Sequence, residues 1–304
     1  MFEEAGEPVG RRPDPEVCAH WRLTPGPVLG DRASGTWAAT RNGAAFVLKR
    51  FGADFPDWPY TLRVAAAVRA QGWPTPEPAE APMIRPDGAW VLFHRLLGRS
   101  VRPAEQDKPA EERARGRLLA RFHVAAAATG ITSQRGGFAR PAEVVADPEL
   151  DRWLRTHEVA RPADGRVLRA CRDAAAEWFA ANANPDTPSS VIHGDFTPWN
   201  LLFDDGRLTG VVDFEGAHHT YQMADFALSW RGYHDDVLRG YDEVRSLSEI
   251  EWRLVRPVFW AWLFIGVKDA LAAHYGGTGP APDFTWQLTH LRVRSPLLEE
   301  KAGP

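Results

Sequence analysis

The stretch from residue 191 to 215 constrains the fold more than any other part of the chain. It reads VIHGDFTPWNLLFDDGRLTGVVDFE, with short apolar runs on both sides of an Asp-Asp-Gly segment (204–206). An Asp-Gly pair between alternating apolar segments indicates a tight β-hairpin. Antiparallel pairing then places Asn200, at the start of the hairpin, beside Asp213, at its end. With Asp195 on the loop just upstream, the sequence predicts three polar side chains that converge at the open end of one hairpin.

An Asp followed by a converging Asn and Asp suits phosphoryl transfer. Asp195 would accept the proton of an attacking hydroxyl group, while Asn200 and Asp213 would offer hard oxygen ligands to Mg²⁺. The H-x-D-x-x-x-x-N spacing is that of the kinase catalytic loop, with Gly194 where protein kinases have Arg. HGDFTPWN followed by VVDFE resembles the aminoglycoside phosphotransferase and choline-kinase-like family of small-molecule kinases. The alternative interpretation is a hairpin with an ordinary polar rim, because Asp and Gly are common turn residues.

This resemblance implies an α+β protein with a bilobal, protein-kinase-like fold. We expect a flexible leader over residues 1–20, followed by a small antiparallel β N-lobe over residues 21–97 that binds the nucleotide. A larger, mostly helical C-lobe over residues 98–304 would carry the catalytic loop and the substrate site. The resemblance also implies Mg²⁺ as cofactor and ATP or GTP as cosubstrate.

The predicted N-lobe contains a candidate phosphate-binding lysine. Asn-Gly within Arg41-Asn42-Gly43 predicts a second hairpin, whose following strand carries Lys49 on the face opposite its apolar neighbour. A strand Lys beside a nucleotide site pairs with the α- and β-phosphates. The alternative is a solvent-facing edge Lys, with Arg50 as an equally cationic neighbour. Gly30 and Gly35 bracket a loop (30–35) that we expect to cover the phosphates, with Ser34 as a contact.

The helix expected after this strand departs from the family pattern. Residues 58–71 are rich in helix formers and are followed by a Gly and three Pro. The resemblance implies a Glu on this helix that pairs with the strand Lys, but the segment contains no acidic residue. Either an acid such as Asp54, Asp57 or Glu77 replaces it from outside the helix, or Lys49 is held by phosphate alone. A nucleotide-binding pseudokinase or scaffold without turnover is therefore the alternative function.

Two further positions complete the candidate nucleotide and metal sites. The apolar strand expected over residues 90–97 should run into the hinge, where backbone groups of His94 and Leu96 would meet the adenine edge. Glu215 lies two residues after Asp213, so on an extended strand both side chains point the same way. Glu215 would then bind a second metal ion, or it is a solvated turn acid.

Other polar residues of the predicted C-lobe have less specific interpretations. Asp225 stands just before an apolar helix, where the helix dipole favours an acid, and the resemblance suggests that it braces the catalytic loop. His123, in a helix expected over residues 105–128, is interpreted as a core histidine. An acidic and aromatic cluster over residues 230–243 would suit a cationic or polyhydroxylated substrate, although each of its residues is individually typical of a solvated helix face.

Charge, apolar segments and cysteine positions limit the classes of binding partner and the cellular compartment that we expect for this protein. The formal net charge of −4 argues against a general nucleic-acid binder. The N-terminus lacks the apolar core of a signal peptide, and the most apolar segment, 258–267, is too short to span a bilayer. Cys18 and Cys171 form neither a metal-ligand spacing nor a disulfide framework, so we expect a protein of the reducing cytoplasm.

We therefore interpret the chain as an ATP- or GTP-dependent O-phosphotransferase acting on a hydroxyl group of a small molecule. No A-P-E segment follows the DFE motif, and residues 213–225 leave little room for the activation loop of a protein kinase. The resemblance includes antibiotic-resistance kinases, which makes an aminoglycoside-type antibiotic, and more generally a cationic acceptor, one candidate substrate. Fold-level resemblance does not identify the substrate.

Overall fold

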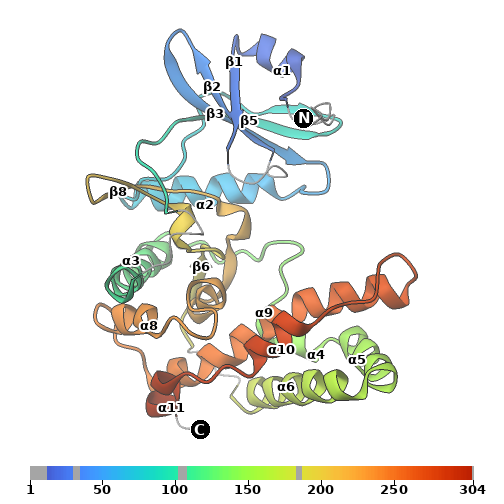
Figure 1. The fold of residues 1–304 in the computed structure, drawn as a ribbon. Coiled ribbons are helices and arrows are strands. Elements are labelled where there is room, and N and C mark those ends of the chain that lie inside the picture. The colour runs from blue at the N-terminus through green and yellow to red at the C-terminus, as the bar shows by residue number, and fades with distance from the viewer. Residues whose placement is uncertain (1–11, 30–34, 102–107, 183–186, 303–304) are drawn as a thin grey trace, which may run out of the picture. The chain divides into compact units, whose positions relative to one another are not determined.

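The computed structural model describes residues 12–29, 35–101, 108–182 and 187–302. Ser34 and the predicted phosphate-covering loop around it lie outside the described residues. The chain divides into two compact units, one formed by residues 1–101 and 200–215, the other by residues 102–199 and 216–304. The predicted α+β, protein-kinase-like class is confirmed: the first unit is built on an antiparallel sheet and the second is mostly helical (Figure 1).

The sheet of the first unit has the strand order β1-β2-β3-β5-β4. Its strands are β1 (Thr24–Val28), β2 (Thr36–Arg41), β3 (Ala44–Gly52), β4 (Met83–Arg85) and β5 (Gly88–His94). The predicted hairpin joins β2 to β3: Asn42 (φ 53°) and Gly43 (φ 80°) are both left-handed, as a type I′ turn requires. Local turn chemistry therefore sets the register that pairs Thr36 with Lys49.

The two faces of this sheet bury different sets of side chains. One face packs Trp37, Leu48 and Trp90 against helix α1 (Pro15–His20). The other packs Phe51 and Val91 against Trp58 and Leu62 of helix α2 (Trp58–Ala70). Side chains alternate along a strand, so Lys49 lies on the α2 side, opposite the fully buried Leu48, as predicted.

Helix α1 corrects the expected leader. Residues 15–20 are not a flexible segment, because Val17 and Cys18 are buried in the core on the α1 side of the sheet. Pro15 occupies the first turn, and the Asp14 carboxylate accepts a hydrogen bond from the Glu16 N–H (2.8 Å). These are helix-start signals that the polar, Pro-rich composition of the segment concealed. Residues 1–11 lie outside the part of the chain that the structure describes.

The predicted Asp-Gly hairpin is also present, as β7 (Leu201–Asp204) and β8 (Arg207–Val211). Asp205 (φ 44°) and Gly206 (φ 75°) form its turn. The hairpin belongs to the first unit, not to the region from residue 98 onward in which we expected it. Backbone hydrogen bonds explain this, since the Val211 N–H donates to the Pro74 carbonyl (2.8 Å), and Phe203 and Arg99 exchange N–H···O bonds (2.9 and 3.0 Å).

The second unit is a set of helices around a two-stranded sheet. Its strands are β6 (Ser189–Ile192) and β9 (His218–Tyr221), which pair antiparallel. The helices of more than one turn are α3 (Pro109–Ala128), α4 (Pro141–Ala146), α5 (Pro148–Ala160), α6 (Pro162–Ala181), α8 (Asp235–Asp242), α9 (Glu249–Tyr275), α10 (Thr285–Leu291) and α11 (Pro296–Ala302), and the single turn α7 (Phe226–Ser229) precedes α8.

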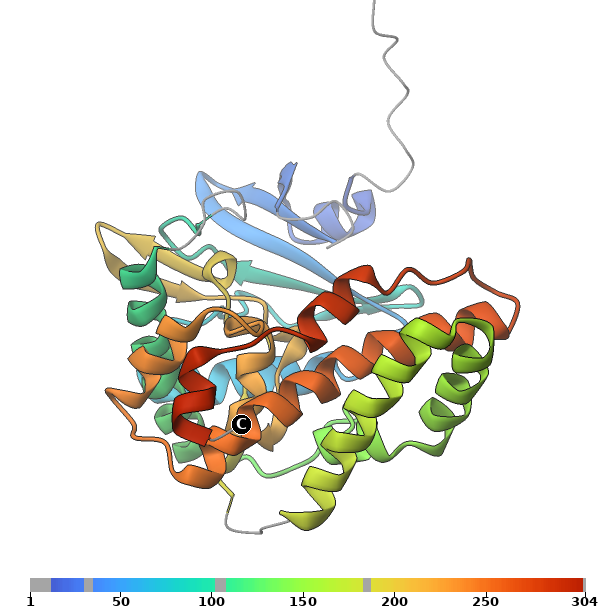
Figure 2. The same cartoon turned by 60° about the horizontal axis from the view of Figure 1, so that its bottom comes forward.

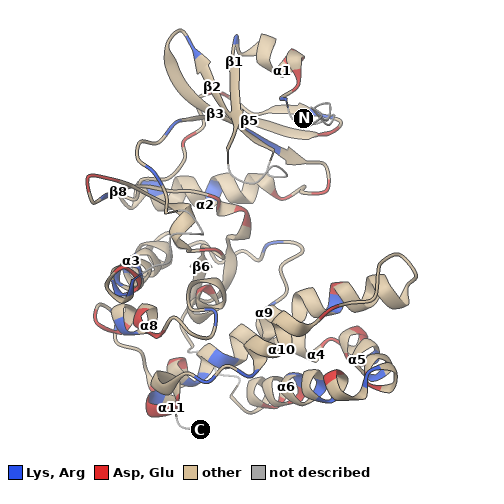
Figure 3. Cartoon of the chain, in the orientation of Figure 1, with Lys and Arg blue, Asp and Glu red and all other residues tan. Residues whose placement is uncertain are grey.

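The long helix α9 contacts most of the other helices of the second unit. It starts with a capping box, in which the Ser248 N–H donates to the Glu251 carboxylate (3.0 Å). Figure 2 shows α5 and α6 lying beside it, and both helices contact α9. Lys and Arg residues are interspersed with Asp and Glu along the described helices (Figure 3). None of the helices in the described ranges is both long and apolar enough to cross a membrane.

Candidate active site

In the first unit, Lys49 forms ion pairs with two carboxylates at the end of the β7–β8 hairpin. Its Nζ lies 2.9 Å from Oδ1 of Asp213 and also contacts Oε1 of Glu215. The lysine side chain is only 15% exposed, so these pairs are partly shielded from solvent. The structure thus brings together three of the residues that the sequence indicated: a strand lysine and both acids of the DFE segment.

These contacts answer the question raised by the acid-free helix. α2 has no acidic residue in its described sequence, and none of the proposed substitutes reaches the lysine. Glu77 instead pairs with Arg69 (3.6 Å). An acid from outside the helix therefore does pair with Lys49, as the first alternative proposed, but it comes from the end of the hairpin and not from the three residues named, with Asp213 at a sequence separation of 164 residues.

The backbone at the hairpin's end explains why Asp213 points to the lysine. Leu201 pairs with Val211, and the Val212 N–H donates to the Asn200 carbonyl (2.9 Å). Asp213 then adopts a left-handed conformation (φ 68°), which turns the chain out of the strand. Asp tolerates this conformation better than most residues, at a cost of roughly 1 kcal/mol or more. Asn200 and Asp213 therefore lie at adjoining ends of the hairpin, as antiparallel pairing predicted, and Asn200 is buried.

The donor set at this end of the hairpin fits a hard cation. Asn200, Asp213 and Glu215 carry only oxygen acceptors, and the two carboxylates already surround a positive charge, the Lys49 ammonium group. Within the described residues, no three His, Cys, Asp or Glu side chains gather as a ready-made metal cage. An all-oxygen donor set suits Mg²⁺, which is usually held by one or two carboxylates together with phosphate oxygens and water.

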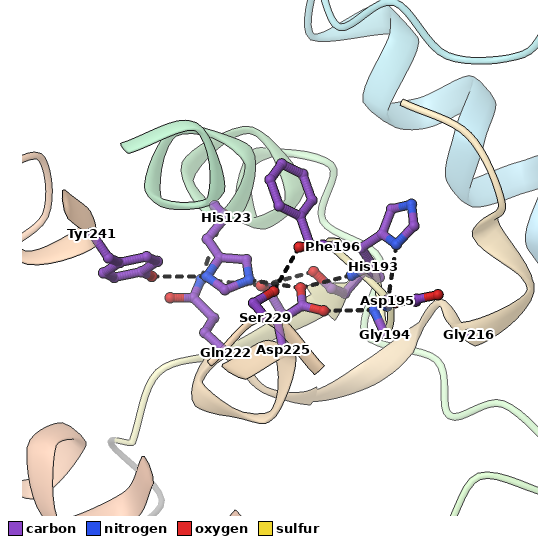
Figure 4. A network of polar contacts seen from close by, with 12 residues as sticks. His123, His193, Gly194, Asp195, Phe196, Gly216, Gln222, Asp225, Ser229 and Tyr241 are labelled. Atoms are coloured by element: carbon purple, nitrogen blue, oxygen red, sulfur yellow. Dashed lines mark hydrogen bonds and ion pairs between the residues drawn. The ribbon is translucent and has the colours of Figure 1, made fainter. Parts of the chain in front are cut away.

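In the second unit, the backbone before Asp195 is fixed by the carboxylate of Asp225 (Figure 4). Oδ2 of Asp225 accepts the His193 N–H (2.9 Å), and Oδ1 accepts the Gly194 N–H (2.6 Å). Asp195 donates its own N–H to Nδ1 of His193 (3.2 Å). The suggestion that Asp225 braces this loop is confirmed, and the tight turn depends on Gly194 (φ 81°).

Asp225 is itself held by a series of buried hydrogen bonds that includes His123. Nε2 of His123 lies 2.9 Å from Oδ2 of Asp225, and Nδ1 lies 2.8 Å from the Tyr241 hydroxyl. A carboxylate only accepts hydrogen bonds, so Nε2 must donate, and in the neutral imidazole Nδ1 then accepts from Tyr241. Burial opposes ionisation of Asp225, but its hydrogen bond with His123 and the nearby His193 keep its pKa below the usual range.

His123 is a core histidine, as interpreted from the sequence, and its exposure is 0%. The sequence did not indicate that it contacts the residue bracing the catalytic loop, nor that Tyr241 belongs to the same chain of hydrogen bonds. Burial raises the pKa of the Tyr241 hydroxyl, so it remains a proton donor. Ser229 was also missed: its hydroxyl donates to the Phe196 carbonyl (2.7 Å) and ties α7 to the loop (Figure 4).

The predicted hinge follows β5. The His94 N–H donates to the Glu77 carbonyl (2.9 Å), and the Arg95 N–H donates to the Ala45 carbonyl (3.4 Å). Leu96 has no hydrogen bond to any other described residue, so its backbone groups remain open to a ligand. The Leu96 backbone is therefore the part of the expected hinge that has no hydrogen-bond partner among the described residues.

The acidic residues of the 230–243 segment already have partners within the chain. Asp235 accepts hydrogen bonds from the Trp230 indole (2.9 Å) and from the Ser295 hydroxyl (2.7 Å). Asp236 pairs with Arg239 (3.8 Å), and Asp242 accepts a hydrogen bond from the Leu247 N–H (2.8 Å). Glu243 pairs with both Arg113 and Arg117. These contacts hold helices together, so the cluster gives no support to a cationic acceptor.

Comparison with known proteins places this chain in a family. The family model for phosphotransferase enzymes (APH) matches residues 27–258. A homoserine kinase of Gluconobacter oxydans is 28% identical over 149 residues, which are 45% of each chain. A homoserine kinase of Rhizobium johnstonii is 29% identical over 224 residues, 64% of this chain and 63% of that protein. The matched region thus spans less than two thirds of these relatives.

Solved structures agree at the level of the fold. A microcompartment-associated aminopropanol kinase gives a TM-score of 0.62 at 17% identity, covering 92% of this chain and 98% of that chain. A thermostable mutant of an aminoglycoside phosphotransferase, in a ternary complex with ADP and hygromycin B, gives 0.66 at 16% identity, covering 95% and 98%. With the family model matching most of its length, the chain belongs to the phosphotransferase enzyme family.

Proposed function

We propose that the protein transfers a phosphoryl group from ATP or GTP to a hydroxyl group of a small molecule. The observation that carries this proposal is the ion-paired arrangement of Lys49 with Asp213 and Glu215, a cation and two hard ligands at one place. Family membership supports the reaction class. Homoserine kinase relatives and the aminopropanol kinase neighbour make an amino alcohol the first acceptor to test, ahead of an aminoglycoside.

In this proposal each residue has one task. Asp195 orients the acceptor hydroxyl and takes its proton, while the Asp225 carboxylate fixes the backbone that carries it. Asn200 and Asp213 hold Mg²⁺, with Glu215 as a further ligand, and the metal supplies charge neutralisation on the phosphates. Lys49 leaves its carboxylates and binds the α- and β-phosphates. The His94 carbonyl and the Leu96 backbone receive the purine.

A nucleotide-binding protein without turnover is the competing function, and the acid-free α2 is the observation that favours it. A lysine without any acidic partner would be poorly positioned in the absence of nucleotide. Lys49 does have partners, in Asp213 and Glu215, so the missing helix acid does not leave it unconstrained. We therefore place phosphoryl transfer first.

The nucleotide site is tested by thermal unfolding with ATP or GTP, each with and without Mg²⁺. The native protein should be stabilised by one of them in a Mg²⁺-dependent manner, by about 2.7 kcal/mol at a hundredfold excess over Kd. Asp213→Asn should abolish the Mg²⁺ dependence. Asp205→Asn is the matched control, because it makes the same change at another left-handed Asp of the same hairpin.

Transfer itself is tested by mass spectrometry of an acceptor panel for the gain of one phosphate. Asp195→Asn should lower turnover by about 10²- to 10⁴-fold, the usual share of a general base, while nucleotide stabilisation stays near the native value. Stabilisation without transfer to any acceptor would favour the competing function. Failure of every nucleotide to stabilise the native protein would refute the proposed nucleotide site.

A further inference from the structure

Arg231, in the second unit, has a conformation that its surroundings impose. Both Arg231 (φ 52°) and Gly232 (φ 89°) are left-handed, which costs an Arg roughly 1–2 kcal/mol. The Nε of Arg231 donates to the Leu228 carbonyl (3.0 Å), closing the end of α7. At Gly232 there is little room for a side chain, because a Cβ would lie 3.2 Å from the Phe259 ring. The turn therefore fixes the direction in which the arginine leaves the backbone.

The guanidinium group lies against the catalytic loop. Its central carbon is 4.7 Å from the centroid of the Trp199 ring, and Trp199 follows Asp195 by four residues in HGDFTPWN. The hydrogen bond from Ser229 to the Phe196 carbonyl (2.7 Å) fastens the same end of α7 to the same loop (Figure 4). Stacking on an aromatic face orients the guanidinium plane and leaves its N–H edge available.

The two Nη groups of Arg231 are not bound by any residue in the described part of the chain. The Arg231 backbone N–H donates to the Phe226 carbonyl (3.4 Å), but apart from the Nε bond and the aromatic contact its guanidinium group has no hydrogen bond or ion pair with the residues that the structure describes. The acids that follow it in the chain do not compensate it, since Asp235 binds Trp230 and Ser295, and Asp236 pairs with Arg239. A half-buried arginine whose two Nη groups bind none of the described residues can bind an anion with both of them.

We propose that Arg231 binds a carboxylate of the acceptor, so that the acceptor is a hydroxy acid or hydroxy amino acid. The two Nη groups match the two oxygens of a carboxylate in a bidentate pair. This inference rests on the proposed function and names the substrate class of that same site. It assigns the anion to the acceptor, because Trp199 and Asp195 belong to one loop, and Asp195 is the residue proposed to meet the acceptor hydroxyl.

The test compares acceptors that differ only by the carboxylate. L-Homoserine and 3-aminopropan-1-ol form one such pair, and other hydroxy acids are each matched with their decarboxylated counterparts. For the native protein, kcat/KM should be at least about 100-fold higher for the member that carries the carboxylate. Arg231→Gln should remove this preference, with the loss in the acceptor KM, and leave the nucleotide KM unchanged. Arg231→Lys should recover part of it, because charge remains but the planar fork is lost.

Arg239→Gln is the control, because it makes the same substitution at an arginine whose side chain is 40% exposed and whose one ion-pair partner among the described residues is Asp236, at 3.8 Å. Equal activity of the native protein on both members of each pair would overturn the inference. So would an Arg231→Gln effect confined to the nucleotide KM, which would assign the arginine to a phosphate.

Failure of the proposed function would look different. If no acceptor is phosphorylated, binding of the carboxylate-bearing compounds is measured by calorimetry on the protein saturated with a non-hydrolysable nucleotide and Mg²⁺. Binding that Arg231→Gln weakens at least tenfold, and Arg239→Gln does not, would support the carboxylate site without turnover. Absent binding, or binding equal in the two variants, would overturn it.

Discussion

Replacing Gly194 by Ala should disturb the catalytic loop far more than the same replacement at Gly43 disturbs the first sheet. The two glycines have nearly the same backbone conformation, with φ of 81° and 80°. They differ in their surroundings, because a Cβ at Gly194 would lie 2.2 Å from the Gly216 carbonyl oxygen, whereas one at Gly43 meets nothing within 4 Å. The pair therefore separates the cost of a left-handed alanine from the cost of a steric clash.

The expected magnitudes follow from these two geometries. A left-handed Ala costs about 1 kcal/mol at either position. At Gly194 the carbonyl must also move away by roughly 1 Å to reach normal contact, and forcing extra atoms into a packed site typically costs about 1–3 kcal/mol more. With about 2–4 °C per kcal/mol, Gly43→Ala should lower the Tm by about 3 °C and Gly194→Ala by about 6 °C or more.

The assay is thermal unfolding of both variants followed by turnover on the best acceptor. Gly194 donates its N–H to Asp225 and precedes Asp195, so a displacement of about 1 Å should lower kcat by about 100-fold. Gly43→Ala should keep native kcat. Equal losses of Tm in the two variants, or native turnover in Gly194→Ala, would refute the argument that the close approach to Gly216 positions the loop.

Three further changes test the charges of the two units. Asp225→Asn should lower the free energy of unfolding by about 3 kcal/mol, because it breaks a buried pair with His123. The pKa of Asp225 lies below the usual range, so this contribution is present above about pH 4 and disappears in stronger acid. In chemical unfolding, the stability of the variant should therefore fall less steeply with decreasing pH than that of the native protein. Lys49→Met should weaken nucleotide binding about 10- to 100-fold. It should also raise the affinity for Mg²⁺ alone, because the Lys49 ammonium group no longer competes for Asp213. Calorimetry that shows no increase in Mg²⁺ affinity would contradict this. Burial lowers the pKa of His218, so the unfolded chain binds the proton at a higher pH than the folded protein does. The free energy of unfolding should therefore fall as pH drops below about 6.5. His218→Gln should make this fall less steep, and an unchanged pH dependence in urea titrations would count against the argument.

Much of the fold could be predicted because its turns and helix ends depend on residues that are adjacent in the sequence. The Asn-Gly and Asp-Gly turns fix the β2–β3 and β7–β8 hairpins, and alternation along β3 fixes the face on which Lys49 lies. The helix α2 begins near a Pro and ends before a left-handed Gly for equally local reasons. Residues 15–20 were misjudged, because a short helix can be stabilised by distant apolar partners that its own composition does not show.

What the tertiary structure decided is which charges neutralise each other. The family pattern led us to expect an acid on α2 as the partner of Lys49, yet the hairpin supplies two. Likewise His123 reaches Asp225 across 102 residues of sequence and Tyr241 across 118. A buried charge or donor takes its partner from whichever segment packs against it, since leaving it unpaired costs several kcal/mol. That choice depends on how distant segments pack, whereas a turn or a helix start depends on the residues beside it.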